Sequence, residues 1–168
     1  MKLLNTAWCR ENRAKPLVFL GAVLIASGVA HLGVYCIDGG SWEGDISWRK
    51  PILFGISAGL TSISMGWVWA SLSTWKYDRF LSWTAALALL LEVGLIDLQQ
   101  WRGVASHFNR STALDSAIYN LMGLLILWVT GVIIVLTARS FTTPLSQPTP
   151  MVIAMQYGLL YLTVSCGL

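Results

Sequence analysis

The chain has 168 residues, of which 55% are hydrophobic and only 11% are charged, whereas soluble domains carry roughly 25% charged residues. This composition excludes an ordinary soluble enzyme domain and is typical of a membrane protein. The net charge of +3 is small, and no basic stripe interleaves with aromatic residues, so nucleic acid is not an expected partner. Cys9, Cys36 and Cys166 are far apart and lack metal-ligand spacing, which indicates free thiols.

Five apolar runs follow one another along the chain, over about residues 16–36, 51–73, 80–100, 116–138 and 151–168. Each has about the 20 residues that cross a bilayer as a helix, and the first is too long for the apolar core of a signal peptide. The runs are continuous, whereas the strands of a membrane barrel alternate. The sequence therefore predicts an all-α fold, a polytopic transmembrane helical bundle of about five spans. Residues 1–168 would form a single integral membrane domain in contact with the lipid bilayer.

The first two spans carry small or weakly polar side chains at helical spacing. Ala22, Ala26 and Ala30 recur every fourth residue, with Gly21 and Gly28 nearby, which predicts a close interface with another helix. In the second span, which begins at a proline, a weakly polar face is formed by Ser57, Thr61 and Ser64.

Two further features concern the ends of the spans. The nine tryptophans lie mostly near these ends, where their rings would form belts at the lipid headgroups. The proline-rich stretch 139–150, RSFTTPLSQPTP, cannot be regular helix and links the last two spans.

Basic residues predict the orientation of the bundle. If the N-terminus is cytoplasmic, seven basic residues fall on that side and four on the other: Lys2, Arg10, Arg13, Lys15, Lys76, Arg79 and Arg139 against Arg49, Lys50, Arg102 and Arg110. Cytoplasmic loops carry the excess of Lys and Arg, so the N-terminus is predicted to be cytoplasmic. The expected location is a bacterial inner membrane.

The densest polar chemistry of the chain lies between the third and fourth spans, in the stretch 97–115, DLQQWRGVASHFNRSTALD. We expect residues 101–115 to be an ordered capping or re-entrant segment with His107 facing inward, toward Glu92 or His31. Four apolar side chains would anchor it, and a hydroxyl would cap the following helix next to an acid: Trp101, Val104, Phe108 and Leu114, then Ser111 or Thr112 beside Asp115. Gly103 would provide the turn after the third span.

Glu92 lies about twelve residues into the third span, ~18 Å from its inner end in a hydrocarbon core of ~30 Å. An acid at this depth usually faces the bundle interior and marks a proton, ion or substrate path, although a protonated glutamate bonded to a neighbouring helix is the alternative. We expect Glu92 to face Ser57, Thr61 and Ser64. Gln99 lies on its face of the helix, whereas Asp97 points to one side.

The two histidines offer a second chemistry. His31 lies in the outward half of the first span and His107 lies just outside the third. They could hold the iron of haem b axially, or one of them could join Glu92 and Asp97 around a metal. A hydrogen-bonded histidine in the core is the commoner alternative.

Basic residues lie near the end of the bundle that is predicted to face outward. Arg49 would be an interfacial anchor, whereas Lys50 and Arg102 could pair with Glu92, Asp97 or Asp115, or bind an anionic group. The polar centre predicted to bind a ligand thus contains nine residues: Lys50, Glu92, Asp97, Gln99, Arg102, Ser106, His107, Asn109 and Asp115.

Two stretches, WRKPILFGISAGLT at 48–61 and DLQQWRGVASHFNRSTALDSAIYNLMG at 97–123, resemble an uncharacterised family of bacterial multi-span membrane proteins. That family has a helix beginning Trp-x-Lys-Pro-x-Lys-Phe and a Gln-x-x-Arg-Gly-x-x-Ser-His-Phe-Asn segment. Leu53 stands where the family has its second lysine. The resemblance covers the first four spans and places Glu92 at the family's intramembrane acid and these residues at its polar positions: Gln99, Arg102, Gly103, Ser106, His107, Phe108, Asn109, Thr112 and Asp115. It implies no activity, and longer members continue beyond the fifth span.

Three functions fit the sequence. The first is a membrane protein whose polar site opens to the outer face and binds or passes a small solute or proton. The second is a haem or metal electron-transfer protein that uses His31 and His107, which an absorption spectrum would reveal. The third is an accessory subunit of a membrane complex or a homo-oligomer, whose polar segment docks a partner.

Overall fold

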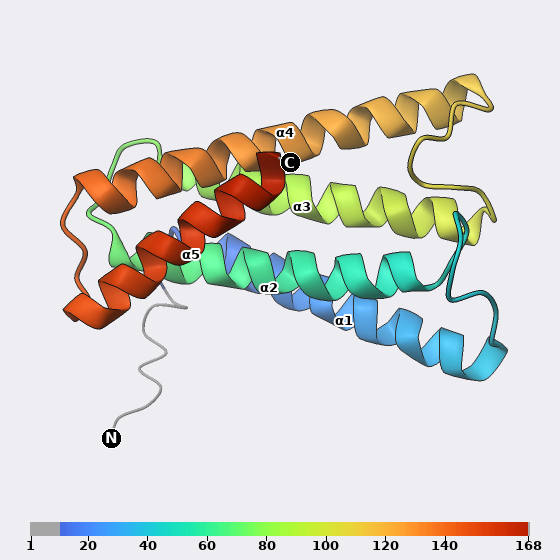
Figure 1. The fold of residues 1–168 in the computed structure, drawn as a ribbon, viewed down its shortest axis with the longest axis horizontal. Coiled ribbons are helices and arrows are strands. Elements are labelled where there is room, and N and C mark those ends of the chain that lie inside the picture. Colours follow the sequence, from blue (N-terminus) through green and yellow to red (C-terminus); the bar gives the residue numbers. More distant parts are fainter. Residues whose placement is uncertain (1–10, 168) are drawn as a thin grey trace.

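The computed structural model describes residues 11–167, so Lys2, Trp8, Cys9 and Arg10 of the sequence predictions lie outside the described residues. The described chain has five helices and no strand, and Figure 1 shows how the helices are arranged. The helices are α1 (Lys15–Asp38), α2 (Arg49–Ser71), α3 (Asp78–Trp101), α4 (Ala113–Thr142) and α5 (Thr149–Gly167). All five are long and apolar enough to cross a membrane. The predicted all-α bundle with five spans is confirmed.

Helices α1 to α4 run side by side along the long axis, whereas α5 is shorter and crosses the bundle obliquely (Figure 1). Loops 39–48 and 102–112 lie together at one end, which we call the polar end. The links 72–77 and 143–148 lie at the opposite end, which we call the Asp78 end. Each chemistry-bearing group described below belongs to one of these ends or lies between them.

Glycines bring α1 and α2 into backbone contact. A Cβ built on Gly59 would lie 2.6 Å from the carbonyl oxygen of Gly21, and one on Gly55 would lie 2.9 Å from the Cα of Gly28. The Ser62 hydroxyl donates to the carbonyl of Leu17 at 2.7 Å across the same interface. Close approach of this kind is how helices associate where lipid removes the hydrophobic driving force.

The predicted small-residue interface of α1 is therefore only half right. Gly21 and Gly28 are buried, but Ala22, Ala26 and Ala30 are exposed on the surface of the bundle. At about 100° per residue, Ala22, Ala26 and Ala30 lie about 100° to 180° around the helix from Gly21, whereas Gly28 lies within about 20° of it. Only glycine allows the backbones to touch, so its stripe, and not the alanine stripe, sets the contact.

Adding a methyl group at this contact should be costly. We expect Gly59→Ala to destabilise the protein by about 1–3 kcal/mol, the usual cost of overpacking. Gly94→Ala is the matched control, because a Cβ there meets no atom within 4 Å, and alanine has the higher helix propensity. Thermal unfolding in detergent, followed by circular dichroism, measures both. Equal unfolding temperatures for the two variants would contradict the close α1–α2 contact.

The main hydrophobic core is built from all five helices, from Leu17 and Leu24 in α1 to Met155 and Leu159 in α5. Trp69 is among the largest fully buried side chains of this core. It is thus an exception to the predicted interfacial belts, because its indole N–H has a buried acceptor, described below. Trp42, Trp48, Trp75 and Trp101 do lie at helix ends or in loops.

The proline-rich link is shorter than predicted. Helix α4 continues to Thr142 and α5 begins at Thr149, so residues 139–142, 149 and 150 are helical. Residues 143–148 are not helical, and they pair with the end of α2. Leu145 forms an antiparallel bridge with Leu72, and the Ser146 N–H donates to the Ser71 carbonyl at 3.1 Å. This pairing joins the last helix pair to the second helix.

Candidate functional site

The residues predicted to form one polar centre lie in three separate groups in the folded chain. Glu92 and His107 line one cavity, Gln99 and Arg102 meet Asp115, and His31 meets Asp97. Glu92 and Asp97 are on different sides of α3, as the helical spacing predicts. Ser106 and Asn109 position segment 102–112, and Lys50 lies beside it without contacting an acidic side chain in the described chain.

Asp115 is the centre of the polar network at the polar end. Its Oδ1 accepts from Arg102 Nη1 at 2.8 Å and from Gln99 Nε2 at 3.1 Å, while its Oδ2 accepts from the Thr112 hydroxyl at 2.7 Å. The Thr112 hydroxyl also accepts from the Asp115 backbone N–H, which makes Thr112 the N-cap of α4. Arg102 also donates to the Gln99 side chain. These bonds close the turn from α3 to α4.

The segment 102–112 is held by polar contacts and not by apolar anchors. Asn109 donates to the Ala105 carbonyl at 3.1 Å and accepts from the Ser111 N–H at 3.1 Å. The prediction of buried anchors is wrong for three of the four residues, because Trp101, Phe108 and Leu114 are exposed. Much of the surface of these three side chains faces away from the bundle, where headgroups and lipid tails would take it up. Gly103 has φ +67° and makes the predicted turn.

Glu92 is buried in the bundle, with 8% of its surface exposed, and one of its oxygens, Oε2, has no hydrogen-bond partner among the described residues. It lines a cavity of about 290 Å³ that extends to segment 102–112. The walls come from three helices and that segment, and they include Phe54, Ala58, His107, Tyr119 and Gly123. A buried polar atom without a partner costs free energy, so a carboxyl that lines a cavity is a group to which a ligand, an ion or water can bind.

The predicted partners of Glu92 on the second span are wrong. Ser57 and Ser64 are exposed, and Thr61 and Ser64 line a different cavity, between α2 and α5. The residues of α2 that share the cavity with Glu92 are Phe54 and Ala58. The hydroxyl-bearing face of α2 is rotated away from α3 because the glycine contact with α1 fixes the rotation of α2. The wall opposite Glu92 is therefore apolar.

His107 lies at the end of this cavity nearest the polar end, and its inward placement agrees with the prediction. Its ring packs on Phe54 with centroids 5.5 Å apart, and the Ser106 hydroxyl lies 2.9 Å from Nδ1. Burial and, second, the positive charge of Lys50 hold the pKa of His107 below its usual value. The neutral imidazole is thus favoured at neutral pH.

The position of His107 predicts a pH dependence. A histidine whose pKa is lowered by folding stabilises the protein above its unfolded pKa of about 6.5, and this contribution is lost as the pH falls below that value. Lys50→Gln removes the positive charge that helps to lower the pKa of His107, so this pKa should rise toward its ordinary value. A titration of the His107 ring by NMR measures the shift, with Arg49→Gln as the control on the same turn. The same pKa in wild type and Lys50→Gln would refute the influence of Lys50.

His31 and Asp97 form a second buried pair, between α1 and α3. Nδ1 of His31 donates to the Ser27 carbonyl at 2.9 Å and lies 4.0 Å from Oδ2 of Asp97, which accepts from the Ser27 hydroxyl at 3.0 Å. Nε2 of His31 accepts from the indole N–H of Trp101 at 3.0 Å. Trp48 packs against His31 and Trp101, at 6.0 and 5.3 Å. Spacing indicates Ser27 as a neighbour of His31, since the two are four residues apart on one helix face.

Haem or metal ligation by His31 and His107 stays a prediction. In this arrangement both ring nitrogens of His31 already have protein partners. The two histidines also share no contact, because His31 meets Trp48 and Trp101 whereas His107 meets Phe54. In the described part of the chain, no group of three or more His, Cys, Asp or Glu residues could hold a metal ion.

The strongest charge cluster of the bundle is one that the sequence does not indicate. Asp78, at the start of α3, is 1% exposed. Its Oδ1 accepts from Trp69 Nε1 at 2.9 Å and from Arg139, and its Oδ2 accepts from Arg13 Nη1 at 3.1 Å and from the Trp75 N–H at 2.7 Å. The cluster joins the start of α1, both ends of the α2–α3 link and the end of α4.

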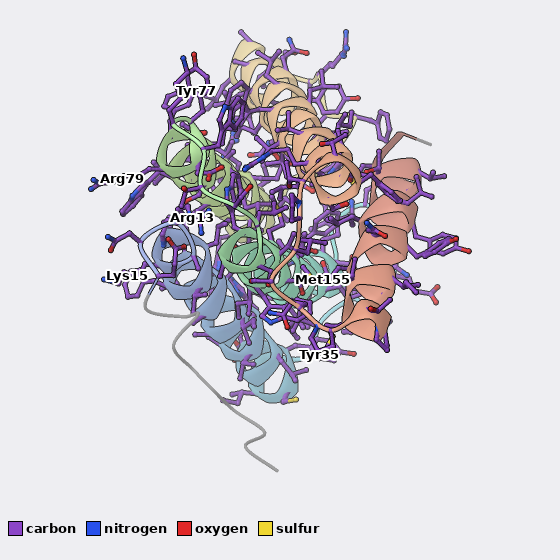
Figure 2. All side chains as sticks on the ribbon, turned by 90° about the vertical axis from the view of Figure 1, so that its left-hand side faces the viewer. Arg13, Lys15, Tyr35, Tyr77, Arg79 and Met155 are labelled. Carbon is purple, nitrogen blue, oxygen red and sulfur yellow. The ribbon has the colours of Figure 1, made fainter. Side chains whose placement is uncertain are left out.

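Figure 2 views the bundle from the Asp78 end. Arg13 points in between the helices there, whereas Lys15 and Arg79 point away from the bundle. Arg13 and Arg139 also donate to the Leu72 and Ser73 carbonyls, at 3.1 and 2.7 Å. All four donors to Asp78 come from the protein itself. The cluster therefore has a structural role, and neither carboxylate oxygen of Asp78 is free for a ligand.

Comparison of the chain with protein-family models, with curated proteins and with solved structures finds no match. The functional conclusion therefore depends on the geometry of the described residues.

Proposed function

We propose that this integral membrane protein binds a small, mainly apolar solute in the cavity beside Glu92, with Glu92 as the group that carries a proton or pairs with the solute. The observation that supports this most is the buried Oε2 of Glu92, which has a cavity in front of it and no partner among the described residues. An ionised carboxylate alone in hydrocarbon is costly, so Glu92 holds a proton or meets a cation.

The composition of the cavity supports a solute over a proton alone. Apart from Glu92, His107 and Tyr119, the wall residues are apolar, and a small number of placed polar groups in an apolar pocket is the usual pattern of a ligand site. A volume of about 290 Å³ is at the small end of known sites. Asp78, by contrast, offers a ligand no free carboxylate oxygen, because protein groups donate to both of them.

In this proposal the cavity opens to the outer face of a bacterial inner membrane, with the N-terminus cytoplasmic. The seven-to-four distribution of basic residues supports this orientation. A chain with Cys36 as its only cysteine should react with an impermeant thiol reagent on intact cells. A chain whose only cysteine is Thr74→Cys, in the opposite α2–α3 link, should not. The reverse pattern would invert the orientation.

A hydrophobic carbodiimide tests the site itself. The reagent adds to a protonated carboxyl and rearranges to a stable N-acylurea, which mass spectrometry locates on the chain. We expect Glu92 to be modified in membranes and Asp78 to remain unmodified. Failure to modify Glu92 would overturn the proposed function.

The route to Glu92 is tested by filling the cavity. Gly123 lines the cavity, and a Cβ there meets no atom within 4 Å, so Gly123→Leu places a side chain in the space. Gly131→Leu is the matched control in α4, with equally free space around its Cβ but outside the cavity. We expect only the first variant to protect Glu92. Equal labelling in both would mean that the reagent reaches Glu92 by another route.

A further inference from the structure

We propose that the solute is a monovalent organic cation, an ammonium with one aromatic or short aliphatic group, which binds in exchange for the proton of Glu92. This inference rests on the proposed function and adds the charge and chemical class of the ligand. It comes from three features of the described residues that line the cavity: one unpaired carboxyl, aromatic rings, and no cationic side chain.

Glu92 is a buried acid that no arginine among the described residues neutralises. Glu92 has no hydrogen bond or ion pair with any described residue, whereas Asp115 and Asp78, also buried, each accept from at least one arginine. The fold thus neutralises Asp78 and Asp115, two buried acids at helix starts, and leaves Glu92, in the interior of α3, open. A carboxylate in a site of low dielectric binds a cation more strongly than any neutral group of the same size.

The walls of the cavity carry aromatic rings. Phe54, Phe108 and Tyr119 line the same cavity as Glu92, and the Phe108 and Tyr119 rings lie with their centroids 5.5 Å apart. The face of an aromatic ring attracts an ammonium group, and the attraction grows when the cation is desolvated. Leu89 and Met122 complete an apolar surface for the body of the ligand.

Few titratable side chains on the described walls could affect the binding of a cation beside Glu92. The titratable side chains on the walls besides Glu92 are His107 from segment 102–112 and Tyr119 from α4, and α2 contributes none. The imidazole of His107 is held neutral by burial and by Lys50. Lys50 and Arg110 are the nearest cations that the contacts identify, and neither lines the cavity. No fixed positive charge on the described walls therefore opposes an incoming cation.

The exchange balances in charge. The protonated carboxyl of Glu92 releases its proton to water at the polar end, and the ammonium takes its place beside the carboxylate. No bond to carbon forms or breaks. Charge in the cavity stays at zero before and after, which is the condition for crossing a hydrocarbon region at low cost.

Matched probes separate charge from shape. Benzyltrimethylammonium, benzylammonium, benzyl alcohol and benzoate share one ring and differ in charge, and isothermal titration calorimetry on the protein in nanodiscs measures each. We expect both cations to bind at least about 30-fold more tightly than the alcohol, the factor that corresponds to the smallest usual value of a buried charge pair. Repeating the titration in buffers of different ionisation enthalpy should show release of about one proton per cation. Equal affinity for the alcohol, or binding without proton release, would overturn the exchange.

Glu92→Gln keeps the shape of the side chain and should reduce cation affinity by the same factor. Glu43→Gln, in the exposed loop 39–48, is the matched control and should bind like wild type. Gly123→Leu should block binding with Glu92 intact, and Gly131→Leu should not. Unchanged affinity in Glu92→Gln would overturn the cation site.

Carbodiimide labelling distinguishes the two proposals. If Glu92 is labelled through the cavity but no cation binds, the ligand class proposed here is wrong and the solute site stands. If Glu92 is not labelled and no cation binds, both are wrong.

Discussion

Replacing Asp78 by alanine should destabilise the protein by about 3–5 kcal/mol, which is the cost of leaving buried charges without their partner. Asp78 is the common acceptor of Arg13 and Arg139, and the indole of Trp69 also donates to it. Its loss leaves Arg139 without a carboxylate partner and Arg13 with Glu11 as its remaining one, and both guanidinium groups are mostly shielded from water, at 13% and 12% side-chain exposure. Unfolding in detergent or in lipid, followed by tryptophan fluorescence, measures the change.

Asp38→Ala is the control for the Asp78 variant, since Asp38 is also at a helix end but is exposed. We expect it to change stability by less than about 0.5 kcal/mol, as for most surface substitutions. A small effect of Asp78→Ala, close to that of Asp38→Ala, would show that the cluster does not hold the Asp78 end together.

Asp115→Ala should make the amides of segment 102–112 exchange about 10- to 100-fold faster, the range that corresponds to a lost hydrogen bond to a charged group. The substitution removes the carboxylate that accepts from the Thr112 hydroxyl and leaves the buried side chain of Gln99 without its acceptor. Hydrogen exchange followed by mass spectrometry resolves this segment from the helices on either side.

Leu114→Ala is the control for this prediction. Leu114 is next to Asp115 but exposed, so its loss should leave exchange in 102–112 unchanged. If Leu114→Ala accelerated exchange as much as Asp115→Ala does, apolar anchoring and not the Asp115 network would order the segment.

The helices were predictable because their signal is local. Each apolar run is continuous and long, and Pro51 and the prolines of 139–150 mark boundaries that differ by only a few residues from those of the fold. The rotation of each helix was less predictable. Ala22 and Gly21 are both small and adjacent, and only the contact partner decides that Gly21 meets α2.

The residues of the candidate site could be predicted from the sequence, but which of them contact one another could not. Arg102 and Asp115 pair as the sequence suggests, because both lie in one short segment. The partners of Asp78 could not be foreseen, since Arg13 and Arg139 are 65 and 61 residues away from it. Exposure of Trp101 and Phe108 was also missed, because aromatic side chains at a membrane end can face either the protein or the headgroups.

We propose above that the cavity beside Glu92 opens to the outer face. Ala58 lines this cavity on α2 and can carry a reporter, as Ala58→Cys in a chain whose native cysteines are serine. A small, water-soluble, impermeant thiol reagent added outside intact cells should modify this cysteine, and Gly123→Leu in the same chain should prevent the reaction. A cysteine at position 58 that reacts only when the reagent reaches the cytoplasmic side, or that does not react from either side, would contradict the account.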